Sequence, residues 1–115
     1  MRLTVLQAQF IGLPTPTTHP LVETLAEAGG IMFLCPLCYI KHGGAEGTHR
    51  VLVWFEGRGV PRGAVPLPRW RVSGTGMEDL SLSPSIQLLA PEMPGVPRDQ
   101  VECRWHGFVR GGDAT

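Results

Sequence analysis

Two short cysteine motifs, separated by more than half of the chain, constrain this sequence most. Cys35-Pro-Leu-Cys38 lies in the first third, Cys103-Arg-Trp-His106 lies near the C-terminal end, and together they contain all three cysteines. Two residues between ligands allow a tight turn to direct both side chains at one ion, and three sulfurs with one imidazole make a tetrahedral zinc shell. The pattern therefore predicts one structural zinc ion bound by Cys35, Cys38, Cys103 and His106.

Such an ion would connect two distant parts of the chain. Four protein ligands leave no coordination position for water or a substrate, which indicates a structural rather than a catalytic site. The free energy of binding at a site of this kind is also folding free energy. We therefore expect residues 1–115 to form a single zinc-stapled domain. Residues 111–115 are expected to be a frayed tail.

Two other interpretations of the cysteines are open at this point. Cysteine is among the most buried residue types, so the thiols could simply pack in a core. Cys35-Pro-Leu-Cys38 could also be a dithiol redox motif that follows an apolar strand, although a redox thiolate needs a helix N-terminus to lower its pKa. Gly43-Gly44 is expected to end any helix here after about one turn. No βαβ alternation surrounds the motif, which favours the metal interpretation.

His42 offers an alternative to His106, because it follows the first motif closely. It could complete the zinc shell in place of His106. It could also act as a general base on a metal-bound water, which would make the chain a metal-dependent hydrolase. The simpler interpretation is a loop histidine with an ordinary hydrogen bond. The pattern predicts His49, in contrast, as a partly exposed residue at the start of a strand.

Glycine and proline punctuate the whole chain, with 15 and 11 occurrences, yet 43% of the residues are hydrophobic. This combination indicates short ordered elements joined by many turns rather than disorder. A short helix is expected to begin at Pro20. The predicted fold is mainly β, an α+β chain with one short helix and a small antiparallel, zinc-ribbon-like sheet with long Gly/Pro-rich loops. Alternating or apolar runs predict strands at residues 3–11, 31–34, 48–55, 69–73, 80–83 and 101–110, and loops at 57–68 and 91–97.

The charges of the chain balance, since ten basic and ten acidic side chains cancel. A global attraction to a phosphate backbone is therefore excluded, and nucleic-acid binding would need a local patch. Arginines interleaved with Trp54, Trp70 and Trp105 could provide one, by pairing with phosphates and stacking on bases. Nucleic acid is thus an alternative partner that the sequence does not favour.

The cysteine count and the N-terminal sequence indicate a compartment. Three is an odd number, whereas a small secreted domain usually carries an even, disulfide-forming set. The first residues lack the apolar core of a signal peptide, and no window approaches the roughly 18 to 20 apolar residues of a membrane span. We expect a soluble, cytoplasmic protein without a membrane partner.

The segment Leu82-Ser-Pro-Ser-Ile86, followed by Cys103-Arg-Trp-His106 and the apolar strand after it, resembles a small family of zinc-binding proteins from bacteria and phages. Its members carry a cysteine clip, an L-x-P-S-I segment and a closing C-x-x-H motif. The resemblance covers residues 31–112. In some genomes such proteins are encoded beside ubiquitin-like conjugation components, which implies a class of partner and the cytoplasm of a bacterial or phage-infected host cell.

The function expected from these features is that of a small structural-zinc domain. It would act as a protein-interaction or accessory module, phage-encoded in some settings, and would have no enzymatic activity of its own. Three alternatives stand beside this prediction. They are a nucleic-acid-binding zinc module, a metal-dependent hydrolase and a C-x-x-C redox protein.

Overall fold

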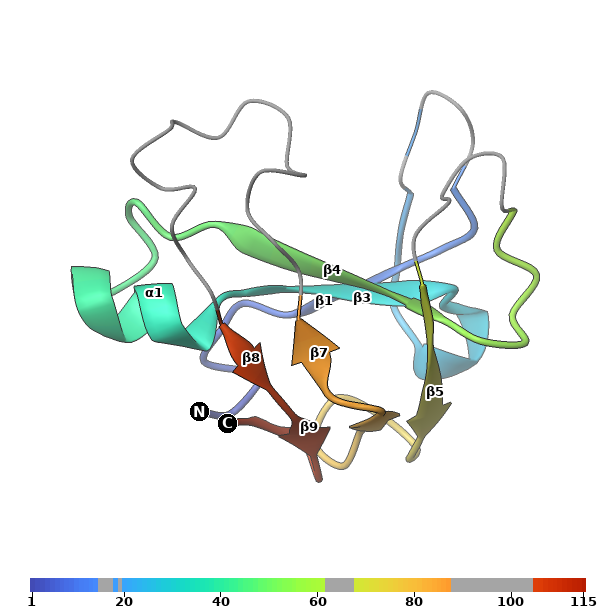
Figure 1. Ribbon diagram of the computed structural model, residues 1–115. Coiled ribbons are helices and arrows are strands. Elements are labelled where there is room, and N and C mark those ends of the chain that lie inside the picture. Colours follow the sequence, from blue (N-terminus) through green and yellow to red (C-terminus); the bar gives the residue numbers. More distant parts are fainter. Residues whose placement is uncertain (15–17, 19, 62–67, 88–104) are drawn as a thin grey trace.

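A mixed six-stranded sheet forms the centre of the chain, in the order β2-β1-β3-β4-β5-β6 (Figure 1). The computed structural model describes residues 1–14, 18, 20–61, 68–87 and 105–115. The mainly β class with little helix is confirmed. The sheet is mixed rather than wholly antiparallel, because β4 and β5 pair in parallel. Its strands are β1 Gln9–Ile11, β2 Leu21–Val22, β3 Gly30–Leu34, β4 Arg50–Phe55, β5 Arg69–Ser73 and β6 Ser81–Ser83.

The described helical segments are a short 3₁₀ helix, Leu25–Glu27, and the helix α1, Pro36–His42. The prediction of a helix beginning at Pro20 is wrong, because Leu21 and Val22 pair with β1 as an edge strand. The 3₁₀ helix begins only after Thr24, whose hydroxyl accepts a hydrogen bond from the Glu27 amide at 3.3 Å.

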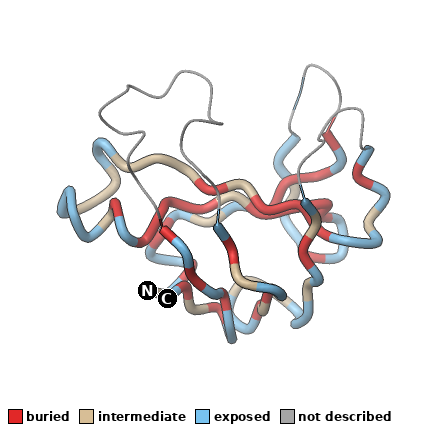
Figure 2. The backbone as a smooth tube through the Cα atoms, in the orientation of Figure 1, coloured by how far each residue is buried: buried red, intermediate tan, exposed pale blue. Residues whose placement is uncertain are grey.

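Strands β3 and β4 are apolar on both faces, as expected for central strands. Phe33 and Val53 are fully buried in the main core on one face. Ile11, Trp54 and Val60 form a second, smaller cluster with the partly buried Met32 and Leu52. Figure 2 shows that buried residues follow these two strands through the middle of the molecule. The prediction that residues 48–55 form a central strand is confirmed, since β4 lies between β3 and β5.

The C-terminal segment adds two small ladders. One pairs β7, Ile86–Gln87, with β8, His106–Gly107, and the other pairs β9, Val109–Arg110, with β10, Asp113–Ala114. The expectation of a frayed tail at residues 111–115 is wrong, because β10 pairs with β9 and Ala114 is only 1% exposed. A turn at Gly111-Gly112 returns the chain onto its own strand.

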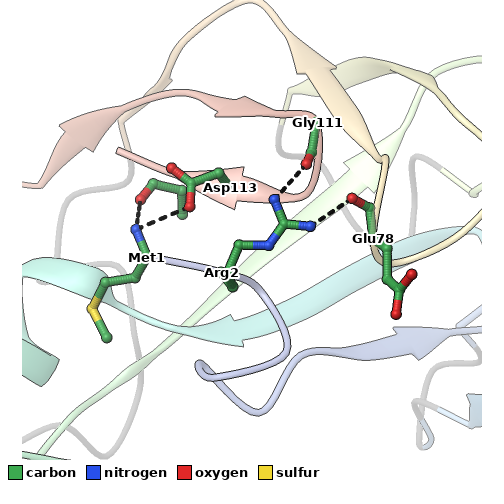
Figure 3. Close-up of polar contacts among 6 residues, drawn as sticks. Met1, Arg2, Glu78, Gly111 and Asp113 are labelled. Atoms are coloured by element: carbon green, nitrogen blue, oxygen red, sulfur yellow. Dashed lines mark hydrogen bonds and ion pairs between the residues drawn. The ribbon is translucent and has the colours of Figure 1, made fainter.

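The two ends of the chain lie side by side and are bonded to each other (Figure 3). The Met1 amino group donates a hydrogen bond to the Ala114 carbonyl at 2.6 Å and lies 3.4 Å from an Asp113 carboxylate oxygen. The Arg2 guanidinium donates to the carbonyls of Gly111 at 2.8 Å and Glu78 at 2.7 Å. These contacts attach the last hairpin to the rest of the fold.

The predicted Gly/Pro-rich loops fall largely outside the described residues. Residues 62–67 and the whole 91–97 segment belong to this part, so the structure does not test those loops. Among the helices of the described ranges, none has the length and apolar character that a membrane span requires.

Gly107 provides a test of how tightly the C-terminal ladder packs. A Cβ atom added there would lie 2.7 Å from the Trp105 ring and would collide with the Thr115 carbonyl oxygen. We expect Gly107→Ala to lower the free energy of unfolding by about 1–3 kcal/mol, as overpacking does. Gly76 is the matched control, because a Cβ there meets nothing within 4 Å. Gly76→Ala should change stability by less than about 0.5 kcal/mol in denaturant unfolding, and equal effects of the two variants would contradict the packing.

Candidate metal centre

Cys35 and Cys38 lie at the junction of β3 and α1. Cys35 is the residue that precedes the helix, and Pro36 occupies its first turn, where the missing N–H of proline costs no hydrogen bond. The Tyr39 amide donates to the Cys35 carbonyl at 2.9 Å and closes the first turn. Both cysteines belong to the main core, with Cys35 fully buried and Cys38 8% exposed. Among the described residues neither takes part in a disulfide bond.

The chain leaves α1 through a turn that returns it to the cysteines. Gly43 ends the helix in the left-handed conformation, with φ 70°. The Gly44 amide donates to the Tyr39 carbonyl at 3.0 Å, and the Thr48 hydroxyl donates to the Gly44 carbonyl at 2.7 Å. This folded turn brings residue 49 to the start of β4.

The pairing of β3 with β4 then sets His49 against Cys35. The antiparallel register pairs Leu34 with Arg50, so the next residues outward are Cys35 and His49. The Cys35 amide donates to the His49 carbonyl at 3.0 Å and extends the ladder by one step. His49 is thereby held directly opposite the first cysteine.

These three residues form a group suited to a metal ion. The sulfurs of Cys35 and Cys38 and a ring nitrogen of His49 all lie within 4.8 Å of one another. A tetrahedral zinc site with bonds of about 2.0–2.3 Å requires ligand atoms about 3.5–3.8 Å apart. Small side-chain movements would reach that spacing. The three side chains therefore lie close enough to bind a metal ion.

The environment of His49 also favours a metal ligand. Both ring nitrogens are buried, and neither makes a hydrogen bond of good geometry to any residue that the structure describes. A buried polar group without a partner costs about 1–3 kcal/mol, which a metal bond to one nitrogen would offset. Burial lowers the pKa of His49 and so favours the neutral imidazole, which is the form that binds metals.

The structure places the four predicted zinc ligands differently. Cys35 and Cys38 lie together, as expected, whereas Cys103 is outside the described residues. His106 is exposed at the start of β8, and its Nε2 lies 2.9 Å from the Ser85 hydroxyl. It does not belong to the group that contains Cys35 and Cys38. The complete set of four stays a prediction, and the structure adds His49, which the prediction assigned to a strand start without a metal role.

A redox role for Cys35 and Cys38 requires a helix after the motif, a preceding βαβ unit and partly exposed thiols, and only the helix is found. Gly43 ends the helix, as expected, but α1 spans seven residues, or about two turns rather than one. However, β3 is antiparallel to both of its neighbours, β1 and β4, so no βαβ unit precedes the motif. The thiols of Cys35 and Cys38 are also buried, whereas a reactive thiolate must be partly exposed.

The hydrolase interpretation depends on His42, and the nucleic-acid interpretation depends on three tryptophans. His42 is exposed at the end of α1 and is not part of the ligand group. Trp54, Trp70 and Trp105 are 2%, 5% and 8% exposed, so the rings assigned to base stacking belong to the interior. These three tryptophan rings therefore offer no stacking platform for a nucleic acid.

Comparison of the chain with protein-family models, curated proteins and solved structures found no match. The candidate centre is thus defined by its own geometry, which comprises two buried thiols from the start of one helix and one imidazole from the facing strand.

The lowered pKa of His49 predicts a pH dependence of stability in the metal-free protein. An imidazole whose pKa is lower in the folded chain binds its proton more readily when unfolded. The free energy of unfolding should therefore fall as the pH decreases through about 6.5, the ordinary value. His49→Gln should flatten this slope in urea unfolding measured with chelator between pH 5 and 8. An identical slope in the variant would contradict the burial of the ring.

Proposed function

We propose that this chain is a zinc module in which Cys35, Cys38 and His49 bind one structural zinc ion. The observation that carries the proposal is the convergence of two buried thiols on an imidazole whose buried ring nitrogens make no hydrogen bond of good geometry within the described part of the chain. Thiolate and imidazole ligands favour zinc among the common divalent ions. The carboxylate and carbonyl oxygens that calcium and magnesium prefer are not part of this group.

Cys103 is the fourth ligand in this proposal. The sequence places it two residues before Trp105, whose ring packs edge-to-face on Phe33 with centroids 5.9 Å apart. Phe33 in turn precedes Cys35 by two residues. Cys103 itself lies outside the described residues, so its place in the shell is a prediction from the sequence. The shell keeps three cysteines and one histidine, with His49 in the position first assigned to His106.

In this proposal the zinc ion stabilises the fold. The function that we propose for the module is the binding of a protein partner. A closed four-ligand shell supplies no site for water, so the module has no metal-based catalytic activity. Leu37 and Ile40 lie one turn apart on α1 and are 49% and 69% exposed, next to the metal centre in the sequence. Their side chains offer an apolar contact to a protein partner. The family resemblance adds ubiquitin-like conjugation components as the class of partner, in the cytoplasm of a bacterial or phage-infected cell.

Metal content of single variants tests the zinc proposal. The wild-type chain purified with zinc should contain one ion per chain by native mass spectrometry. Cys35→Ser, Cys103→Ser and His49→Ala should lose the ion and unfold at a lower temperature than the wild type, because structural-zinc binding free energy is folding free energy. His106→Ala is the matched control and should retain one ion, since His106 is exposed and bonded to Ser85.

Cobalt titration separates ligand loss from unfolding. Thiolate-to-cobalt charge-transfer absorption should appear in the wild type and in His106→Ala, and it should weaken in each cysteine variant even where the variant folds poorly. Absence of zinc from the wild type, or unchanged thermal unfolding in strong chelator, would refute the zinc module. Zinc retained in His49→Ala but lost in His106→Ala would restore the ligand set predicted from the sequence.

A further inference from the structure

Ser85 and His106 form a second chemically active group, outside the metal-ligand cluster. The Ser85 hydroxyl lies 2.9 Å from the His106 Nε2 atom. Ser85 directly precedes β7, and its carbonyl accepts a hydrogen bond at 3.2 Å from the indole of the buried Trp70. His106 opens β8 between the buried Trp105 and Gly107. Both members of the pair are thus fixed to ordered elements, which a reactive geometry requires.

Gln87 lies beside this pair. The β7–β8 register places Gln87 directly opposite His106, so the two side chains lie on the same face of the ladder. Ser85 precedes Gln87 by two residues, and residues two apart in an extended chain share a face. A hydroxyl, an imidazole and a side-chain amide therefore lie together on one side of the ladder, where Gln87 and His106 are exposed.

The same face continues into an exposed aromatic ring. Burial alternates from His106 to Arg110, with Gly107 and Val109 buried and the residues between them exposed. Phe108 is 39% exposed, and the Arg110 guanidinium lies 4.3 Å from its ring centre. An apolar surface thus lies next to the serine–histidine pair, where it can contact an apolar acyl group.

We propose that Ser85 is a nucleophile activated by His106 and that this face transfers acyl groups from small apolar esters. With a proton on Nδ1, the His106 Nε2 accepts the proton of the Ser85 hydroxyl as the oxygen attacks the ester carbonyl carbon. The Gln87 amide donates a hydrogen bond to the developing oxyanion. The alcohol leaves with the proton from His106, and water then hydrolyses the acyl-serine with His106 again as the base.

This inference rests on one part of the proposed function, namely that His49 and not His106 completes the metal shell. A nitrogen bound to zinc cannot also accept the serine proton. The two proposals fail in different measurements, because one concerns metal content and the other concerns covalent labelling.

A fluorophosphonate probe tests the nucleophile in the zinc-loaded full chain. The Ser85 oxygen forms a bond to phosphorus, the phosphorus–fluorine bond breaks, fluoride leaves and His106 takes the hydroxyl proton. Intact mass and peptide mapping should show one adduct on Ser85. Ser85→Ala should give no adduct, and His106→Ala should react at least about 100-fold more slowly. Ser83→Ala is the matched control and should react like the wild type, because Ser83 is an exposed serine on β6.

The outcomes are distinguishable once zinc content and thermal unfolding are measured on the same samples. Absence of an adduct on the folded wild type, or equal labelling of Ser85→Ala or His106→Ala, would overturn the inference. Loss of zinc from His106→Ala would overturn it too, because His106 would then be a metal ligand. Labelling of Ser85 in a wild type that binds no zinc would support the nucleophile and remove only the zinc proposal.

Discussion

The antiparallel pairing of β3 with β4 is the constraint on which the rest of the structure depends. These two strands carry the central core, and their register alone places Cys35 opposite His49. A shift by one residue would move His49 to the other face of the sheet and also exchange the buried and exposed sides of β4. The apolar residues that hold the register therefore also hold the metal ligands, so burial of the core and assembly of the site are one event.

The connection between these strands explains why the site needs both a helix and glycines. Thirteen residues lie between Cys35 and His49 in the sequence, and α1 with its left-handed exit at Gly43 folds them into a compact return. The helix also aims Cys38 back toward Cys35, because residues three apart lie on one face. A flexible loop of the same length would reach the same point with a larger loss of entropy on metal binding. The helix thus prepares the site before an ion arrives.

The sequence predicted the strands that have a local apolar pattern. It missed the features that depend on contacts with distant parts of the chain. β3, β4 and β5 follow from runs of apolar or alternating residues, and Cys35 with Cys38 follows from ligand spacing. His49 was missed because a histidine at a strand start has no local signal. Its role appears only when residues 31–34 and 48–55 are aligned as an antiparallel pair. The C-terminal tail was misjudged for a related reason, since its partners, Met1 and Arg2, lie at the opposite end of the chain.

His49 and His106 are the two candidate histidine ligands of the metal, and their different burial suits them to different chemistry. Both ring nitrogens of His49 are buried and make no hydrogen bond of good geometry to a described residue. Burial also lowers the pKa of His49, so its neutral ring is available to an ion. His106 is exposed and already has the Ser85 hydroxyl at its Nε2 atom. A metal bond to His106 Nε2 would replace that contact, whereas at His49 it would replace no hydrogen bond of good geometry to a described residue. The same side chain is therefore suited to coordination in the interior and to proton transfer at the surface, and the fold supplies one of each.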